Sequence, residues 1–456
     1  MCEPLSARRR LAVRVDDPRG PGRMARRALV TEGHARLHPP LSRRPAGAAP
    51  SAPRAGTLHA RSMAIQEPLS LDQLMAIDPL LSEEERMIRD AVRRFVRERY
   101  LPRAADLFAR EEFATDLIPE IAALGLLGGS LTGYGCAGMN SVAYGLALQE
   151  LEYGDSGLRS FVSVQGSLAM YPIWKYGSEA QKQRWLPKMA AAELIGCFGL
   201  TEPDSGSDPS SMKTRARKDG SAYVLTGTKM WITSAPIADL CVVWAKVDDG
   251  GAESIRGFVV ERGMKGLETP LIHGKMSLRA SPTGEIVLNE VRVPEENVLP
   301  GVVGLKGPLG CLTQARFGIA WGALGAARAC YETAVSYARE RVQFGQPIAS
   351  RQLIQSELVE MATEIAKGQL MALHFGRLKD TTGISPVQVS LCKRNNVGWA
   401  LKIARTARGV LGANGILLDY PVIRHMLNLE SVYTYEGTDE VHCLILGNAI
   451  TGHNAF

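Results

Sequence analysis

What this 456-residue sequence lacks narrows its class before any motif is considered. No apolar run approaches the roughly 20 residues that a membrane-spanning helix requires, so we expect no integral membrane segment. The eight cysteines form no Cys-x-x-Cys pair and have no metal-ligand spacing with the eight histidines. This pattern predicts reduced, buried thiols in an intracellular protein, and it predicts no bound metal.

Nucleotide-binding signatures and internal repeats are absent as well. No strand is followed by GxGxxG, and no GxxxxGK[ST] loop occurs, which disfavours a Rossmann or P-loop site. A hydrophobic content of 45% and a charged content of 22% are ordinary for a globular protein. A chain of this length can form two or three domains, or one multilayered unit with a substantial core.

Lysine is missing from residues 1–62, although the excess positive charge lies there. Thirteen arginines and four acids give this segment a net charge of +9. Since the whole chain carries +6, the remaining residues carry −3. A negatively charged body argues against a nucleic-acid-binding protein. Its Pro, Gly, Ala and Arg content predicts disorder. Three interpretations stay open: an organelle-targeting presequence, a polyanion-binding arm, or a start codon assigned too far upstream. Asp16 and Asp17 are unusual in a presequence, and MAIQEPLSL from Met63 looks like a natural start, which favours the third.

Hydrophobic periodicity predicts helices at both ends of the chain and strands in the middle, an α+β class. The first helix begins at a capping box of Ser82 and Glu85, and we expect it to stop at Pro102. Near Cys197 short segments rich in β-branched and aromatic residues begin, as in an antiparallel sheet or barrel. From about Gly310 four long helical segments predict a bundle. The expected parts are a tail at 1–62, an α-helical domain at 79–195, a β domain at 196–303 and an α-helical domain at 304–456.

The stretch YTYEGTDEVH, residues 433–442, contains three carboxylates with different expected roles. Thr438 is predicted to cap a helix, because its hydroxyl can accept an orphan backbone N–H before an apolar helical pattern. Asp439 and Glu440 then lie in the first turn, where acids offset the helix dipole. Glu436 lies before the cap and beside Gly437, whose missing side chain allows close approach of a ligand. Glu436 is therefore a candidate base, although an acid beside a glycine is more often a plain loop residue.

Two stretches near the first expected strands are suited to a flat polar cofactor. CFGLTEPDSGSDPSSMKT, residues 197–214, contains hydroxyls, amides and small residues that can hydrogen-bond at close range. Downstream, TGTKMWIT places Trp231 and Thr233 on a strand, where a ring face and a hydroxyl can flank a ring system. For Trp231 alone, core packing is the simpler role. The glycines of GPLGCLTQARFG and GVLGANG by themselves indicate helix packing and capping.

Five stretches occur in a familiar order: CFGLTEPDSGSDPSSMKT, GTKMWIT, ERVQFGQPIASRQLIQ, VLGANG and YEGTDEVHCLILGNAITG. Together they resemble the acyl-CoA dehydrogenases, and most closely the glutaryl-CoA dehydrogenases, over about residues 79–456. The resemblance implies an N-terminal helical domain, a middle β-barrel-like domain and a C-terminal four-helix bundle. It also implies one FAD per subunit, a homotetramer and an electron-transfer flavoprotein as electron acceptor. The expected location is the bacterial cytoplasm, or the mitochondrial matrix if residues 1–62 are a presequence.

By the same resemblance, several separate parts of the chain contribute to the FAD site. Arg341 and Gln352 are expected to reach the FAD of the adjacent subunit, and the arginine fork matches diphosphate oxygens. The other residues that the resemblance assigns to FAD are Phe198, Leu200, Thr201, Gly206, Ser207, Trp231, Ile232, Thr233, Gly409, Gly412, Thr438 and Phe456.

The resemblance assigns Glu436 as the base that removes the α-proton of an acyl-CoA thioester while a hydride leaves the β-carbon for the flavin. A thioester α-proton is very weakly acidic, so we expect burial to raise the pKa of this carboxylate. A flavin hydroxyl and local backbone N–H groups are expected to stabilise the enolate-like charge. Loss of CO2 from glutaconyl-CoA and protonation by Glu436 then give crotonyl-CoA, a step of lysine and tryptophan degradation.

Selection of a glutaryl group requires a cation at the far end of the acyl pocket. Arg159 is the candidate, with Ser160 beside it and Glu152 two helical turns earlier. From spacing alone, we expect Arg159 to form a surface ion pair with Asp155, which lies four residues earlier. The resemblance instead assigns Arg159 and Ser160 to the distal carboxylate, and an apolar acyl chain would leave Arg159 unpaired. The further residues expected on the substrate side are Ser207, Arg316, Tyr435 and Gly437.

Some residues depart from the pattern of the family. Leu158 replaces a tyrosine and Phe161 replaces a smaller residue near the carboxylate site, which leaves the acyl chain length open. Ala413 replaces a glycine, a change expected only to tighten a turn. The alternatives are an acyl-CoA oxidase, a dehydrogenase for another short-chain acyl group, and a non-decarboxylating enzyme, although Glu152 and Tyr435 match the decarboxylating type.

Overall fold

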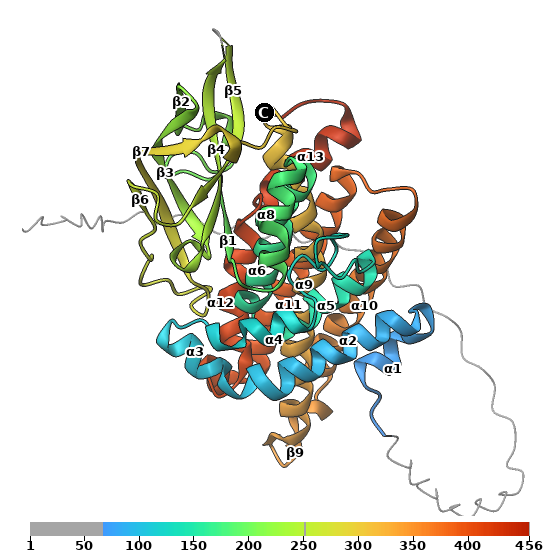
Figure 1. The fold of residues 1–456 in the computed structure, drawn as a ribbon. Helices are drawn as coiled ribbons and strands as arrows, with labels where there is room; N and C mark the ends of the chain where they lie inside the picture. The colour runs from blue at the N-terminus through green and yellow to red at the C-terminus, as the bar shows by residue number, and fades with distance from the viewer. Residues whose placement is uncertain (1–66, 250–251, 456) are drawn as a thin grey trace, which may run out of the picture. The chain divides into compact units, whose positions relative to one another are not determined.

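Helices lie at both ends of the described chain, and the strands of the sheet come between them in sequence (Figure 1). The structure is a computed structural model that describes residues 67–249 and 252–455. The expected tail at 1–62 and the expected FAD contact Phe456 lie outside these residues. Among the described helices, none has the length and apolar character needed to cross a membrane.

The N-terminal part of the described chain is helical, and its first helices show how local sequence sets the boundaries. The predicted capping box is confirmed: Ser82 Oγ accepts the Glu85 N–H at 3.2 Å, and the Glu85 carboxylate accepts the Ser82 N–H at 2.8 Å. The predicted stop at Pro102 is wrong, because helical backbone continues through Val96–Tyr100 and Leu101–Arg103. Proline is accepted there because it lies in the first turn of a new helical segment, where its missing N–H is not required. The helices are α1 Leu71–Met75, α2 Glu83–Phe95, α3 Ala104–Arg110, α4 Ile118–Ala123, α5 Ser141–Gly154, α6 Ser156–Ser163, α7 Tyr171–Tyr176 and α8 Glu179–Ala190.

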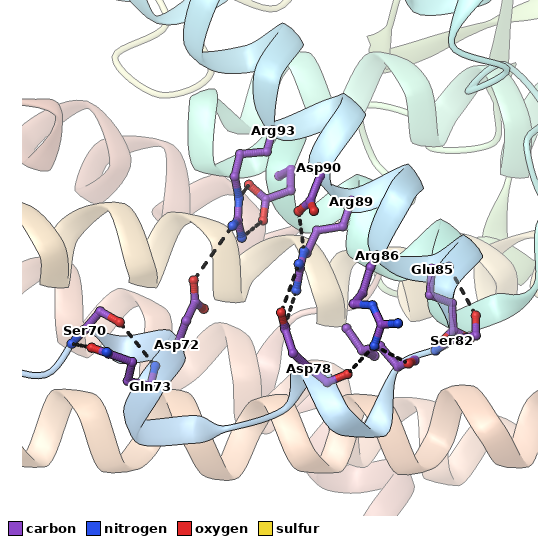
Figure 2. A network of polar contacts seen from close by, with 12 residues as sticks. Ser70, Asp72, Gln73, Asp78, Ser82, Glu85, Arg86, Arg89, Asp90 and Arg93 are labelled. Carbon is purple, nitrogen blue, oxygen red and sulfur yellow. Dashed lines mark hydrogen bonds and ion pairs between the residues drawn. The ribbon is translucent and has the colours of Figure 1, made fainter.

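A polar network joins the segment before α2 to α2 itself, and α2 to α5 (Figure 2). Arg89 on α2 binds the Asp78 carboxylate at 2.5 Å, and Arg86 donates to the Asp78 carbonyl at 3.1 Å. One turn further along α2, Arg93 donates to Glu150 of α5 at 2.8 Å. These contacts orient α2 against α5, and α5 leads directly into α6, which carries Arg159.

The middle of the chain forms one seven-stranded sheet in the order β1-β4-β2-β3-β7-β6, with β5 also paired to β4. The sheet is not wholly antiparallel, because β1 and β2 both pair with β4 in parallel. Sequence analysis missed β2, whose sequence RARKD has none of the expected β-branched or aromatic residues. The strands are β1 Gly196–Gly199, β2 Arg215–Asp219, β3 Ala222–Thr233, β4 Leu240–Asp249, β5 Ala252–Glu261, β6 Leu267–Glu268 and β7 Thr283–Pro294.

The C-terminal part is a bundle built around α9, which packs against α5, α10, α11 and α12. Sequence analysis missed α12 as a separate helix, because its end at Thr434 is followed by only four residues before α13 begins. The predicted cap of α13 is confirmed: Thr438 Oγ1 accepts the Val441 N–H at 3.3 Å. The elements are α9 Lys306–Glu340, the hairpin of β8 Val342–Gln343 and β9 Gln346–Pro347, α10 Gln352–Thr381, α11 Pro386–Val410, α12 Pro421–Thr434 and α13 Asp439–Thr451.

A buried ion pair anchors the loop that follows β1. The side chains of Lys229 and Glu202 are 0% and 6% exposed, and Lys229 Nζ lies 2.8 Å from Glu202 Oε1. The same carboxylate accepts the backbone N–H groups of Lys213 and Thr214 at 2.6 and 2.9 Å. Burial alone raises the pKa of Glu202, but Lys229 and these hydrogen bonds outweigh it and lower the pKa to about 2. The loop of residues 201–214 is therefore held at both of its ends.

We expect Glu202→Gln to lower the free energy of unfolding by about 3 kcal/mol, because the buried amino group of Lys229 would lose the carboxylate that stabilises its charge. In the unchanged protein, the contribution of Glu202 is complete above pH 4.5 and is lost as pH falls toward about 2, since its pKa is depressed in the folded state. Urea unfolding of the purified protein at pH 7 measures the effect of the substitution. The control is Glu295→Gln, which breaks the exposed pair with Lys218 and should cost less than about 1 kcal/mol. Equal stability of the two variants would contradict an anchoring role.

Candidate functional site

Glu436 lies in the short connection between α12 and α13, where the backbone turns sharply. Its φ angle is +52° and that of Gly437 is +93°, in the left-handed half of the map that side chains disfavour. Glu436 Oε2 is buried, and within the described chain it has no hydrogen-bond partner. A buried acceptor that protein groups leave free is available to a ligand.

Two cationic side chains, the partly buried Arg316 and the buried Lys393, hold the carbonyl groups of this connection. Arg316 Nε, from α9, donates to the Glu436 carbonyl at 2.6 Å. Lys393 Nζ, from α11, donates to the carbonyls of Tyr435 and Gly437 at 2.8 and 2.6 Å. Three successive peptide groups are therefore oriented by two cations that come from different helices.

Burial controls the ionisation of the groups around Glu436. It raises the pKa of Glu436 to about 7, against the opposing effect of Arg159, Arg316 and Lys393. Burial likewise lowers the pKa of Lys393 to about 7 and that of His442 to about 3, so the imidazole is neutral. A carboxylate whose pKa lies near neutrality can both accept and return a proton, as a general base must.

Arg159 is buried on α6 and pairs with Glu152, so the surface pair with Asp155 that the spacing predicted is wrong. The side chains of Arg159 and Glu152 are 1% and 0% exposed, and Arg159 Nε lies 2.6 Å from Glu152 Oε2. Asp155 instead caps α6, where its side chain accepts the Gly157 N–H, and it binds Arg424 at 2.6 Å. The spacing rule failed because Asp155 is the N-cap rather than a member of the helix.

Tyr435 connects the Arg159 pair to Glu436. Arg159 Nη2 donates to the Tyr435 hydroxyl, and Ser160 Oγ lies 3.5 Å from the same hydroxyl. Since Tyr435 and Glu436 are consecutive, the guanidinium and the candidate base are close enough for Arg159 to oppose the rise in the pKa of Glu436. The bonds to Glu152 and Tyr435 use two of the five N–H donors of Arg159, which leaves donors for a second carboxylate.

Two glycines make room for these side chains. A Cβ at Gly322 would lie 2.1 Å from Glu152 Oε2, and one at Gly437 would lie 2.9 Å from His442 Nε2. Sequence analysis singled out Gly437, but it missed Gly322, His442 and Lys393. Nothing in the local sequence distinguishes Gly322 from the other small residues of α9, because only its position opposite Glu152 makes it necessary.

The two departures on α6 do not face this site as the sequence suggested. Leu158 and Phe161 are buried in the hydrophobic cluster that also contains Leu117 and Ile121. The Phe161 ring lies 5.0 Å from the ring of Phe113, measured between centroids. These two side chains therefore pack α6 against the N-terminal helices, whereas Arg159 and Ser160 turn toward Tyr435.

Several of the residues assigned to FAD by resemblance lie together on β1, β3 and the loop after β1. The Met230 N–H donates to the Thr201 carbonyl at 2.9 Å, which joins β3 to the start of the loop that holds Gly206 and Ser207. Trp231 comes next, at an irregularity in the pairing of β3 with β7. In the same region Phe198, Leu200 and Ile232 are buried, Thr201 and Thr233 are partly buried, and Gly206 and Ser207 are exposed.

This region fits one face of a planar cofactor. Trp231 has a φ angle of +63°, and 56% of its surface is exposed. A large aromatic side chain in a costly backbone conformation is well explained when another flat group covers the indole. A Cβ at Gly206 would meet no atom within 4 Å, so the adjacent loop leaves space beside it.

The remaining residues assigned to FAD lie elsewhere in the chain. Arg341 and Gln352 are exposed beside the β8–β9 hairpin, which Figure 1 shows at the far end of the bundle from the sheet. The structure does not bring them to Trp231 of the same chain, which is the arrangement expected of residues that serve a neighbouring subunit. Gly409 lies in the last turn of α11, Gly412 begins the short helical turn Gly412–Ile416 that follows, and Thr438 caps α13.

The chain matches three family models in sequence order. They are "Acyl-CoA dehydrogenase, N-terminal domain" at residues 82–193, "Acyl-CoA dehydrogenase, middle domain" at 197–291 and "Acyl-CoA dehydrogenase, C-terminal domain" at 303–451. An acyl-CoA dehydrogenase of Bacillus subtilis is 34% identical over 379 residues, which are 82% of this chain and 99% of that protein.

Solved structures show the same relationship. The crystal structure of a glutaryl-CoA dehydrogenase from Mycobacterium smegmatis is 56% identical, with a TM-score of 0.83, and the match covers 85% of this chain and 100% of that one. A glutaryl-CoA dehydrogenase from the same organism in complex with FADH2 is 52% identical, again with a TM-score of 0.83 and coverages of 85% and 100%. The chain therefore belongs to the acyl-CoA dehydrogenase family, and it is an FAD-dependent oxidoreductase of the glutaryl-CoA dehydrogenase type.

Proposed function

We propose that this enzyme oxidises glutaryl-CoA and decarboxylates the product to crotonyl-CoA and CO2. The observation that carries the proposal is the buried guanidinium of Arg159, which contacts Tyr435, the residue before Glu436, and keeps N–H donors that no other described residue binds. This geometry supports a carboxylate anchor and a base that act on the same acyl chain. Similarity to the glutaryl-CoA dehydrogenase structures supports the same substrate.

Arg159 favours a dicarboxylic acyl group for electrostatic reasons. Glu152 fixes the guanidinium through Nε, and Ser156 Oγ in turn donates to the other carboxylate oxygen of Glu152 at 2.8 Å. The remaining N–H donors of Arg159 are thereby oriented before the substrate binds. An apolar chain end would leave these donors without an acceptor in the interior, at a cost of about 1–3 kcal/mol.

Glu436 is the base in this proposal. Its free, buried Oε2 accepts the α-proton of the thioester, and a pKa near neutrality allows it to hold that proton. FAD, when bound, supplies the acceptor for the hydride that leaves the β-carbon. Arg159 keeps the distal carboxylate in place, and loss of CO2 from the oxidised acyl group leaves a dienolate conjugated with the thioester. Protonation of this dienolate by Glu436 gives crotonyl-CoA and regenerates the carboxylate.

The proposal extends to the assembly and its partners. Phe344 in the β8–β9 hairpin is 95% exposed and Leu353 at the start of α10 is 82% exposed, next to Arg341 and Gln352. Apolar side chains at such exposure, flanked by groups suited to a diphosphate, favour contact with a second copy of the chain. We infer a homotetramer in which Arg341 and Gln352 reach the FAD of a neighbour. An electron-transfer flavoprotein as acceptor, a cytoplasmic location and a place in lysine and tryptophan degradation belong to the same proposal.

Anaerobic mixing of the holoenzyme with glutaryl-CoA should bleach the flavin absorbance, and turnover with an artificial electron acceptor should release CO2 and crotonyl-CoA. Butyryl-CoA, which lacks the distal carboxylate, should react more slowly because it leaves the Arg159 donors unpaired. Preferential bleaching by butyryl-CoA would contradict the proposed substrate. Formation of glutaconyl-CoA without CO2 would contradict only the decarboxylation.

Glu436→Gln should slow flavin reduction by glutaryl-CoA by about 10²–10⁴-fold, because the amide has the size of the carboxylate but cannot accept the proton. In the unchanged enzyme, the rate at low substrate concentration should rise with pH through about 7, because burial raises the pKa of Glu436 and only the ionised form is a base. Stopped-flow absorbance from pH 5.5 to 8.5 measures both effects. The control is Glu440→Gln, an exposed acid in the first turn of α13. A Glu436→Gln enzyme that bleaches at the unchanged rate would rule out Glu436 as the base.

The double variant Glu152→Gln/Arg159→Gln should lower kcat/KM for glutaryl-CoA by about 30-fold, equivalent to about 2 kcal/mol, because the distal carboxylate loses its anchor. Both charges are replaced together so that neither is left buried and alone. Activity with butyryl-CoA should change much less, and the ratio of the two kcat/KM values is the decisive measurement. An equal loss with both substrates would show that the pair supports the fold and does not select the substrate.

The native mass of the holoenzyme, measured by light scattering, should be about four times the chain mass of 49.4 kDa. Phe344→Asp should lower that mass and release FAD, because a charge would be placed in the apolar contact. Met87→Asp is the matched control, since Met87 is 66% exposed on α2 and has no place in the proposed contact. A single-chain mass for the unchanged protein would contradict the tetramer.

A further inference from the structure

Lys393 is a buried cation that neither the resemblance nor the proposed function assigns. It lies on α11 with 1% of its surface exposed. Its Nζ donates to the carbonyls of Tyr435 and Gly437, the two residues that flank Glu436. A buried ammonium group bound to carbonyl oxygens rather than to a carboxylate is costly, and a straight apolar side chain would fill the same space at lower cost. The role of the Lys393 charge is therefore to be sought at the two carbonyl groups beside Glu436 that it binds.

The bonds from Lys393 determine the direction of the peptide groups around Glu436. In a planar trans peptide, the carbonyl of one residue and the N–H of the next point in opposite directions. With the Tyr435 carbonyl directed at Lys393, the Glu436 N–H points away from α11. The Glu436 carbonyl accepts a hydrogen bond from Arg316 on α9, so by the same rule the Gly437 N–H points away from α9. Within the part of the chain that the structure describes, neither N–H donates a hydrogen bond to another protein group.

The left-handed conformation of Glu436 needs such support. A residue other than glycine at a φ angle of +52° is strained by about 1 kcal/mol or more, and the strain persists only where surrounding contacts hold it. Lys393 and Arg316 together bind the carbonyls on both sides of this residue and its own carbonyl. Without the Lys393 bonds, the connection between α12 and α13 is free to relax and to move the carboxylate.

The charge of Lys393 also acts on the carboxylate itself. Burial raises the pKa of Glu436, and Lys393 is one of three cations that oppose the rise. The titratable and charged groups that face Glu436 are Tyr144 on α5, Arg159 on α6, Arg316 on α9, Lys393 on α11 and His442 on α13. Since the pKa of His442 is lowered to about 3, this imidazole adds no positive charge at neutral pH. Arg159 and Arg316 keep their charge in every variant described below.

We propose that Lys393 is a positioning residue for the reaction: it holds Glu436 in its left-handed conformation, directs the Glu436 N–H toward the reacting thioester, and supplies part of the positive charge that keeps the base ionised. The inference rests on the proposed role of Glu436 as the base. Lys393 itself does not touch the reacting atoms.

The test compares Lys393→Met, Lys393→Gln and Lys393→Arg holoenzymes in anaerobic flavin reduction by glutaryl-CoA across pH. Lys393→Met should slow reduction at pH 7 by at least about 10-fold, because the base is displaced from its productive geometry. The ascending limb of its pH–rate profile should move to higher pH, because the positive charge that Lys393 carries below about pH 7 is lost and the pKa of the Glu436 carboxylate rises. The apparent Kd for glutaryl-CoA should stay within a few-fold, since Arg159 still binds the distal carboxylate. Lys393→Arg keeps the charge, so its pH limb should stay near that of the unchanged enzyme.

Lys393→Gln gives a measurement that does not depend on the fold tolerating methionine. The amide can still donate a hydrogen bond but carries no charge, so the pH limb should move as in Lys393→Met while the rate above the limb is less affected. The matched control is Lys402→Met, on the same helix, where Lys402 is exposed and paired with Glu360. An unchanged rate and pH limb in both neutral variants would overturn the inference. The inference would also be overturned if the variants lost only stability or flavin content, while the folded enzyme kept the rate and the pH–rate profile of the unchanged protein.

Glu436→Gln, measured in parallel, separates failure of this inference from failure of the proposed function. If Glu436→Gln reduces its flavin at the unchanged rate, the base is misassigned and the role of Lys393 fails with it. If Glu436→Gln is inert and the neutral Lys393 variants behave like the unchanged enzyme, only the inference about Lys393 fails.

Discussion

The site depends on one constraint: a carboxylate must be buried deeply enough to become basic and still be able to ionise. Removal from water raises the pKa of Glu436, and without compensation it would keep the group protonated. Arg159, Arg316 and Lys393 provide that compensation from three different helices. The protein thus sets the basicity of Glu436 through the balance between desolvation and surrounding positive charge.

The three cations come from α6, α9 and α11, and the fold brings these helices together around Glu436. Of these three helices, α9 packs against both α6 and α11. Gly322 on the surface of α9 leaves space for the Glu152 carboxylate. The connection between α12 and α13 then lies against Arg316 and Lys393. Tyr435 and Glu436 are neighbours in sequence, so the group that contacts Arg159 and the candidate base are positioned by the same few peptide bonds.

Features set by neighbouring residues were predicted well. The capping box at Ser82 and the cap at Thr438 are both present, because a cap depends on a hydroxyl and an N–H within three residues of each other. The succession of helices, strands and helices was also predicted, since the period of apolar residues changes with the type of element. Errors came where local rules competed, as at Pro102, where proline begins a helical turn instead of ending the helix.

The sequence by itself determined the helix caps, the order of the elements, and the motifs that place Glu436 beside a tyrosine and a glycine. Tertiary structure alone decided that Arg159 pairs with Glu152, that Trp231 turns outward at a strand irregularity, and that Lys393 binds the carbonyls on either side of Glu436. Lys393 is the clearest case: it is buried on α11, four residues from each of the buried Val389 and Val397, and sequence analysis did not single it out. The physical reason is that burial and charge compensation depend on distances between segments that are far apart in sequence, and no local pattern records those distances.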